Sequence, residues 1–480
     1  MAAPGRMELP RMRKHITHFS LFPSGSADWV EDRVARDGSV GHVPSHLWLI
    51  GGTLYDLSTY LDAHPGGRFW LEVTRGTDCT DAFEVHHINM TRALSVLGRF
   101  AVGHQPKQLV GATASYVWSD QGFYRTTRRK VREVLRERGV ATGPTNLMKF
   151  LTCVAVLLFA VLFAGTCKTG SVVFATGCGY SIFVLMGIGH NFFHQRDTPW
   201  RFLFDFSLYS STDWRVSHAI SHHLYPNLDL DLEASALEPF VSFMRNRPTN
   251  SWLVYFYWWP LNWVIPVQQA IDHWWRIFTG RSVARPEDAI VIVEVMALVW
   301  CCGFPLGLAL FVHMQGVATL LLQLLSTPVH RSELSWTEGC PAAALDYGEH
   351  TLLSTQEYLC GLCVAWPRLG LLVSLFGCAG FNQHVTHHLF PTVDVSRHHL
   401  VTEIVRAQAA EFGLARHPPQ SWWSLALSTA ATWRRAGDSI GYRPPPLPPP
   451  PQSRRARSPR PSSQAKKLRR CSARSTRLLD

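Results

Sequence analysis

The stretch SVVFATGCGYSIFVLMGIG (Ser171–Gly189) contains no charged residue and leads directly into HNFFH (His190–His194). It is 19 residues long, close to the roughly 20 apolar residues that a helix needs to cross a bilayer. Phe150–Gly165, just before it, is uncharged as well. The two stretches therefore predict a hairpin of two membrane-spanning helices. Buried helices of a large soluble enzyme are the alternative, but their uninterrupted apolar runs are usually shorter.

A second apolar region lies further along the chain. Ala289–Val312, which contains Glu294, overlaps with Phe304–Thr327, and Pro305 falls where the two meet. The region is long enough for two more crossings. We therefore expect an all-α membrane domain with about four spans.

The distribution of charge predicts the orientation of these spans. Thr126–Gly139, before the first span, holds six basic residues, whereas the turn Thr166–Gly170 holds only Lys168. Cytoplasmic flanks of membrane helices are enriched in Lys and Arg. The N-terminal part is therefore expected on the cytosolic side, and a hairpin returns the chain after Gly189 to that same side.

The composition excludes several classes of protein. The chain has 480 residues, of which 46% are hydrophobic and 12% aromatic, so a disordered or collagen-like polymer is excluded. The net charge is +11, but Arg443–Asp480 alone contains eleven basic residues and one acid, a net of +10. The body is thus nearly neutral, and no nucleic-acid partner is expected. The eleven cysteines are scattered and no secretory signal is apparent, so we expect reduced thiols.

The basic residues at the end of the chain lie in a proline-rich segment that cannot bury a core. We expect residues 434–480 to be disordered. A plain solvated tail, a tether to anionic lipid and a ligand for a proline-recognising domain all remain open.

A small polar module precedes the membrane region and contains LWLIGGTLYDLSTYLDAHPGGRFW (Leu47–Trp70). Residues 48–50 and 54–55 predict two short strands joined by a Gly-Gly turn, followed by a helix capped near Asp56 or Ser58. The segment His64-Pro-Gly-Gly would end that helix and hold the imidazole on a constrained turn, as an axial haem ligand requires. Phe83 and His87 are four residues apart, so they would share one face of a helix.

These features resemble the cytochrome b5-type haem domain. The resemblance implies haem b with His64 and His87 as axial ligands, since the family places the second ligand four residues after the Phe. His86 is thereby the less favoured of the two neighbouring histidines. The module is expected to cover residues 42–105, between an N-terminal extension (1–41) and a basic linker (106–145).

Three histidine clusters lie beside the apolar regions: HNFFH at 190–194, HAISHH at 218–223 and HVTHH at 384–388. Residues three or four apart share a helix face, so each cluster could aim two imidazoles at one point. Chance would produce a given three-histidine pattern only about 0.06 times in a chain with this many histidines. Eight imidazoles exceed the four ligands of one tetrahedral zinc and indicate two metal ions, although spacing alone cannot choose the metal.

The three clusters resemble the histidine boxes of the membrane fatty acid desaturases. TDWRVSHAISHHLYPN (Thr212–Asn227) is similar to the group called cytochrome b5-related proteins, which fuse a haem domain to a desaturase-like domain, and HTLLSTQEY (His350–Tyr358) resembles front-end desaturases. The resemblance implies a desaturase-like domain over residues 146–425 and two non-haem irons. Ligands outside the boxes are open, with His350 or His330 as a guess. The implied di-iron ligands are His190, His194, His218, His222, His223, His384, His387 and His388.

The resemblance also implies a reaction. A reductase, expected to be the NADH-dependent cytochrome b5 reductase, would feed the haem, the haem would feed the di-iron site, and O₂ would leave as water while a double bond forms in a fatty-acyl substrate. The expected location is the endoplasmic reticulum membrane, with haem and boxes on the cytosolic side. A lipid hydroxylase, or a haem electron carrier with an inactive desaturase-like domain, are the alternatives. The aromatic segment Ser251–Pro266 predicts an interfacial helix beside an acyl entrance.

Overall fold

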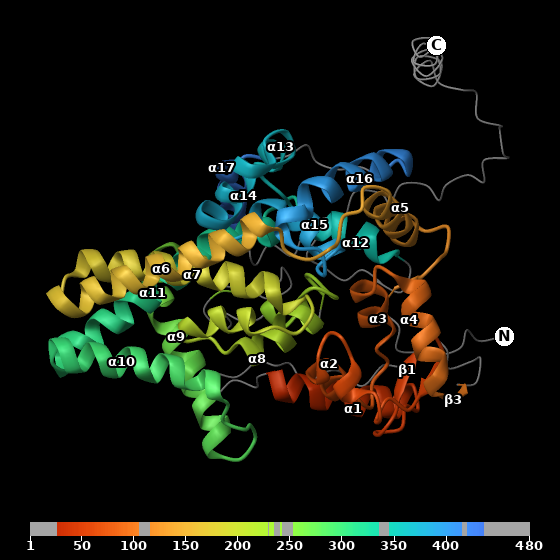
Figure 1. Cartoon of the computed structure of the whole chain (residues 1–480), viewed down its shortest axis with the longest axis horizontal. Coiled ribbons are helices and arrows are strands. Elements are labelled where there is room, and N and C mark those ends of the chain that lie inside the picture. The colour runs from red at the N-terminus through yellow and green to blue at the C-terminus, as the bar shows by residue number, and fades with distance from the viewer. Residues whose placement is uncertain are drawn as a thin grey trace, which may run out of the picture.

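The computed structural model describes residues 26–104, 116–228, 230–234, 241, 253–335, 345–414 and 420–435. The predicted basic tail lies outside these residues beyond Arg435, and so does part of the predicted linker. Two bodies follow one another along the chain, a small α+β module and an all-helical body (Figure 1). This is the predicted multi-domain class.

The small module is built on a three-stranded antiparallel sheet in the order β1-β2-β3. Trp48 pairs with Tyr55 across the first two strands, and Tyr55 pairs with Ala101 across the second and third. Trp48, Ile50 and other apolar side chains form the core of the module. The elements are β1 (Trp48–Ile50), β2 (Thr53–Tyr55), η1 (Leu61–Ala63), α2 (Arg68–Val73), α3 (Thr80–His86), α4 (Met90–Leu97), η2 (Gly98–Phe100) and β3 (Ala101–His104).

The two predicted strands are present, but the helix expected after them is only the single turn η1. The expected cap is not formed, because η1 begins after Tyr60 with no side-chain cap; the Asp56 carboxylate instead accepts the Ser58 backbone N–H at 3.0 Å in the turn before it. The residue before a proline disfavours helical dihedrals, and His64 precedes Pro65 with ψ near 122°. The loop therefore begins as soon as one turn is complete.

The all-helical body contains long apolar helices and a cluster of short ones. In Figure 1, α6, α7, α10 and α11 extend side by side on the left, away from the small module. The elements are α5 (Phe123–Glu137), α6 (Asn146–Thr169), α7 (Val172–Phe193), η3 (Pro199–Phe206), α8 (Ser211–Trp214), η4 (Arg215–His222), η5 (Leu232–Ala234), α9 (Val254–Phe278), η6 (Pro286–Asp288), α10 (Ala289–Cys302), α11 (Phe304–Arg331), α12 (Tyr347–Ser354), α13 (Cys360–Ala365), α14 (Pro367–Leu372), η8 (Val373–Gly377), η9 (Phe381–Gln383), α15 (His384–Leu389), η10 (Val395–Arg397), α16 (His398–Glu411) and α17 (Trp422–Arg435).

Three helices of the described residues, α6, α7 and α11, are long and apolar enough to cross a membrane. The fourth expected crossing corresponds to α10, whose 14 residues span about 21 Å, less than the roughly 30 Å of a hydrocarbon core. Gly303 adopts a φ of +79°, which interrupts the apolar run. The residues after it therefore lengthen α11 instead of α10.

Two helices outside the predicted domains pack against the boxes. α1 (Ser26–Val40) lies within the predicted N-terminal extension, and its Trp29 indole donates a hydrogen bond to the Leu230 carbonyl at 3.0 Å. α5 lies within the predicted basic linker and buries Phe123, Tyr124 and Val131. Both segments therefore add packing surface around the histidine-bearing helices.

A buried charge cluster joins α8, α9 and η6. The His273 ring lies 2.9 Å from an Asp213 carboxylate oxygen through Nδ1 and 3.0 Å from an Asp288 oxygen through Nε2. Arg276 donates to Asp213 at 2.7 Å. Burial opposes the charged ring, but its bonds to the two carboxylates raise the pKa of His273 to about 9. The cluster ties α9 to the helix turn just before the second histidine cluster.

We predict that His273→Gln lowers the Tm of the full chain more at pH 6.5 than at pH 9.5. A group whose pKa is raised on folding stabilises the folded state fully below its unfolded pKa and loses that effect as the pH rises through the folded pKa. The measurement is the Tm difference between wild type and variant at both pH values. A difference that does not shrink at high pH would contradict a charged His273.

Candidate metal centre and haem face

The three boxes converge on one buried region at the end of α7. The first box ends α7, the second lies on the π-helical segment η4, and the third forms α15. All eight predicted ligands are at most 6% exposed. The structure thus brings together every box histidine that the sequence singled out.

The histidines divide into two groups whose candidate ligand atoms lie within 4.8 Å of one another. The first group has five members, which come from all three boxes. The second has four, which come from the second and third boxes and from His330. The five-histidine group is His190, His194, His218, His223 and His387, and the four-histidine group is His222, His330, His384 and His388.

Each box aims two rings at one point, as expected, but the second box does so at two spacings. His218 and His222, four residues apart, form a third group with Glu233, whereas His218 and His223, five residues apart, share the five-histidine group. The backbone explains this, because the His223 N–H donates to the His218 carbonyl at 2.8 Å in the i to i+5 pattern of a π-helix. The wider turn places i and i+5 on the same face.

His330, at the end of α11, completes the second group. Its Nε2 lies 3.0 Å from Nε2 of His222 and 2.7 Å from Nε2 of His384. His350, the other guess from the sequence, is placed elsewhere, with its Nδ1 3.0 Å from the Tyr116 hydroxyl. His330 stands alone after an apolar helix, so no spacing motif marks it in the sequence.

Carboxylates fix the tautomers of two histidines of the second box. The outward Nδ1 of His218 lies 2.7 Å from Glu233, and that of His222 lies 3.0 Å from Asp231. An imidazole that donates from Nδ1 presents a bare lone pair at Nε2. Carboxylate partners of this kind orient metal-bound histidines and raise their basicity.

The Nε2 atoms face one another inside each group. In the first group Nε2 of His190 lies 2.6 Å from that of His218 and 3.0 Å from that of His387. Both ring nitrogens of His194 are buried without a hydrogen-bond partner among the described residues. Burial also lowers the pKa of His223 and His388 well below the ordinary value, which keeps these rings neutral. Opposed lone pairs on neutral, buried rings fit two bound metal cations.

The small module presents two further histidines to each other. The ring centroids of His64 and His87 are 6.3 Å apart. Each Nδ1 bonds a backbone carbonyl, that of Gly67 at 3.1 Å and that of Phe83 at 2.9 Å. Burial lowers the pKa of His87 to about 4. Both rings therefore offer a bare Nε2, as the axial ligands of a haem must, and Phe83 packs 4.5 Å from the His87 ring.

Each of the two glycines in the loop after His64 is required for a different structural reason. A Cβ on Gly66 would lie 2.9 Å from Cε1 of His64. Gly67 has a φ of +96°, and a Cβ there would lie 3.0 Å from Asp197, just after the first box. The loop is thus shaped both to hold the imidazole and to approach the helical body closely.

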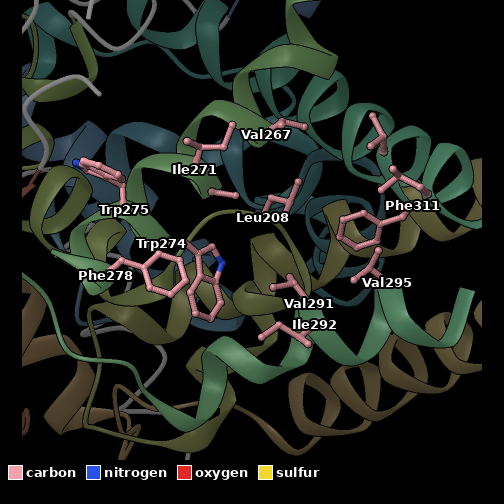
Figure 2. A pocket seen from close by; sticks show the side chains of 13 residues that line it. Leu208, Val267, Ile271, Trp274, Trp275, Phe278, Val291, Ile292, Val295 and Phe311 are labelled. Atoms are coloured by element: carbon pink, nitrogen blue, oxygen red, sulfur yellow. The ribbon is translucent and has the colours of Figure 1, made fainter. Parts of the chain in front are cut away.

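An apolar cavity of about 510 Å³ lies between α9, α10 and α11 (Figure 2). Its lining is almost wholly apolar, and no box histidine contributes to it. Leu208, six residues before Trp214, also lines it, and the Trp214 ring of α8 stacks on His218 with centroids 5.3 Å apart. The lining includes Val267, Ile271, Trp274, Val291, Val295 and Phe311.

Comparisons with known proteins agree with this geometry. A model of the cytochrome b5-like heme/steroid binding domain matches residues 41–105, and a model of fatty acid desaturases matches residues 169–420. The "Cytochrome b5-related protein" of Drosophila melanogaster is 27% identical over 380 residues, which cover 76% of this chain and 82% of the relative. No solved structure gives a significant match.

Two further relatives carry desaturase names. An acyl-lipid (7-3)-desaturase of Chlamydomonas reinhardtii is 23% identical, with 76% of this chain and 75% of the relative covered. An acyl-lipid (8-3)-desaturase of Physcomitrium patens is 22% identical, with 84% and 90% covered. The similarity thus extends through both bodies of the chain.

We predict that His330→Ala removes about half of the bound non-haem metal, because it deletes one ligand from the four-histidine group and leaves the other group intact. The matched control is His350→Ala, which removes an equally buried imidazole outside both groups and should leave the metal content unchanged. Metal analysis of the purified proteins, corrected for haem iron from the visible spectrum, measures both. Equal metal in wild type and His330→Ala would contradict the assignment.

We predict that Gly66→Ala weakens haem retention, since its Cβ displaces the His64 ring. Gly98→Ala is the control, because nothing lies within 4 Å of a Cβ at that position. The measurement is the ratio of Soret to protein absorbance after dilution into apomyoglobin as a haem acceptor. Loss of haem at the same rate from both variants would argue against the proposed packing.

Proposed function

We propose that this chain, which belongs to the fatty acid desaturase family, is a membrane-bound, O₂-dependent fatty-acyl desaturase that draws electrons through its own haem module. The single observation that carries the proposal is the pair of buried histidine groups, which together hold nine imidazoles. The donor set suits iron, for which imidazole is a common ligand. We assign one iron to each group.

When bound, haem b supplies single electrons, and the iron pair supplies the oxidising power that an unactivated C–H bond requires. The chain itself contributes three things. The box rings and His330 hold the metals, Asp231 and Glu233 fix the ring tautomers, and the surrounding core excludes water. Exclusion of water protects a strongly oxidising site from side reactions.

The apolar cavity is an argument for an acyl chain as the substrate. Its lining offers hydrocarbon contacts and almost no polar group, which matches an acyl chain in chemistry. The outer face of α9 exposes Phe256, Trp259 and Phe278, and aromatic side chains favour the membrane boundary. We propose that acyl chains enter beside α9 and that Leu208 marks the inner end of the route.

We further propose that the protein lies in the endoplasmic reticulum membrane with haem and metal groups on the cytosolic side. α7 returns the chain to the side on which α6 begins. The haem module ahead of α6 and the first box at the end of α7 therefore lie on that same side (Figure 1). A cytosolic flavoprotein reductase that uses NADH is the proposed electron donor.

We predict that cells expressing the full chain accumulate a fatty acid with one additional double bond. The measurement is mass spectrometry of lipid products, with double-bond position read from chemical derivatives. A new hydroxyl group instead would assign the chain to the lipid hydroxylases, and no product from protein with bound iron would leave it an electron carrier.

We predict that His64→Ala abolishes haem absorbance and product while the non-haem metal content stays unchanged, because His64 lies outside both metal groups. The matched control is His104→Ala, an exposed histidine of the same module. Product formation without haem would contradict the fused electron route.

A further inference from the structure

Two neighbouring histidines of the small module point in opposite directions. His87 faces His64 across the haem position. His86, the last residue of α3, instead stacks on His194 of the first box, with ring centroids 6.1 Å apart and planes inclined by 20°. One residue step along the chain therefore separates a proposed haem ligand from a ring that contacts a proposed iron ligand.

The surroundings of His86 hold its ring in place. Its Nδ1 donates to the Ala82 carbonyl at 3.0 Å, and the Trp70 ring packs beside it with centroids 6.1 Å apart and planes inclined by 32°. Its Nε2 is buried without a partner among the described residues. The half-buried His86 ring thus lies between Trp70 of α2 and His194 of the first box.

The contacts around this stack keep the two bodies together. The Asp197 backbone N–H donates to the Pro65 carbonyl at 3.4 Å, beside the first box. Arg128 of α5 donates to the Glu84 carboxylate of α3 at 2.7 Å. One turn earlier on α3, the Asp81 carboxylate accepts from the Trp118 indole at 2.9 Å. α3 is thus held from several directions while His86 meets His194.

We propose that His86 is the bridge through which electrons pass from the haem module to the five-histidine metal group. This inference rests on the proposed function, since it requires haem at His64 and His87 and iron at His194. The contact between the His86 and His194 rings couples the haem to the five-histidine group. His86 acts through His194, so it is a positioning residue and is neither a haem ligand nor an iron ligand. Its role explains why two adjacent histidines follow Phe83.

The electron balance is simple. In each transfer one ferrous haem becomes ferric and one ferric ion of the pair becomes ferrous. Two transfers, two protons and one O₂ convert a CH₂–CH₂ unit into a double bond and two waters. The reductase returns the haem to the ferrous state between transfers.

The test compares His86→Ala, which removes the ring, with His86→Phe, which keeps a flat ring of similar size. Full-length holoprotein, loaded with haem and iron, is reduced under nitrogen and mixed with O₂ and acyl substrate. Loss of the ferrous haem band in a stopped-flow instrument gives the transfer rate. Haem content, iron content and the rate of haem reduction by the reductase are measured on each variant, and Trp118→Phe serves as an interface control away from the stack.

We expect His86→Ala to slow haem oxidation roughly tenfold, as loss of partners adjacent to metal ligands commonly does, with haem content, iron content and haem reduction unchanged. His86→Phe and Trp118→Phe should oxidise at rates close to wild type. An unchanged rate in His86→Ala would overturn the bridge, and so would a rate in His86→Phe as slow as in His86→Ala. Loss of haem from His86→Ala would also overturn it, because His86 would then be a haem ligand.

The outcome separates this inference from the proposed function. If wild-type haem is not oxidised when O₂ and substrate are added, the fused electron route itself is wrong. If wild type is oxidised and His86→Ala matches it, the route stands and only the bridge is lost.

Discussion

The mutual approach of imidazole nitrogens in a buried space is the constraint on which the rest of the structure depends. Nine rings place candidate ligand atoms within 4.8 Å of their neighbours in two groups. Burial keeps rings such as His223 and His388 neutral, and Nε2 of His190 lies only 2.6 Å from Nε2 of His218. Converging, buried ring nitrogens of this kind fit the proposed pair of metal cations, and the surrounding elements hold the rings in place.

Several local features follow from this constraint. The second box must feed both groups, and the π-helical segment η4 achieves this by aligning His218 with His223 while His222 turns to the other group. Asp231 and Glu233 then bond the outward nitrogens. The long apolar helix α7 carries the first box, and the long apolar helix α11 carries His330. The ends of both helices meet at the metal groups. The small module contacts the helical body through α3 and the loop after His64.

Much of the site could be predicted from the sequence, because its signals are local. The boxes have regular spacing, and the segment at His64 combines a histidine with proline and two glycines for reasons that the backbone confirms. His330 could not be identified with certainty, since a single histidine after an apolar helix has no spacing signal. The division of the second box depends on a π-helical turn that the residue pattern does not reveal. His86 was considered only as a rival ligand, because its contact with His194 joins residues 108 positions apart.

Anomalous diffraction at the iron edge from crystals of the full chain tests the central claim most directly. The account predicts one peak inside each histidine group, with a third between His64 and His87. A single non-haem peak, or density for another metal with none for iron in the two groups, would contradict a histidine-ligated iron pair.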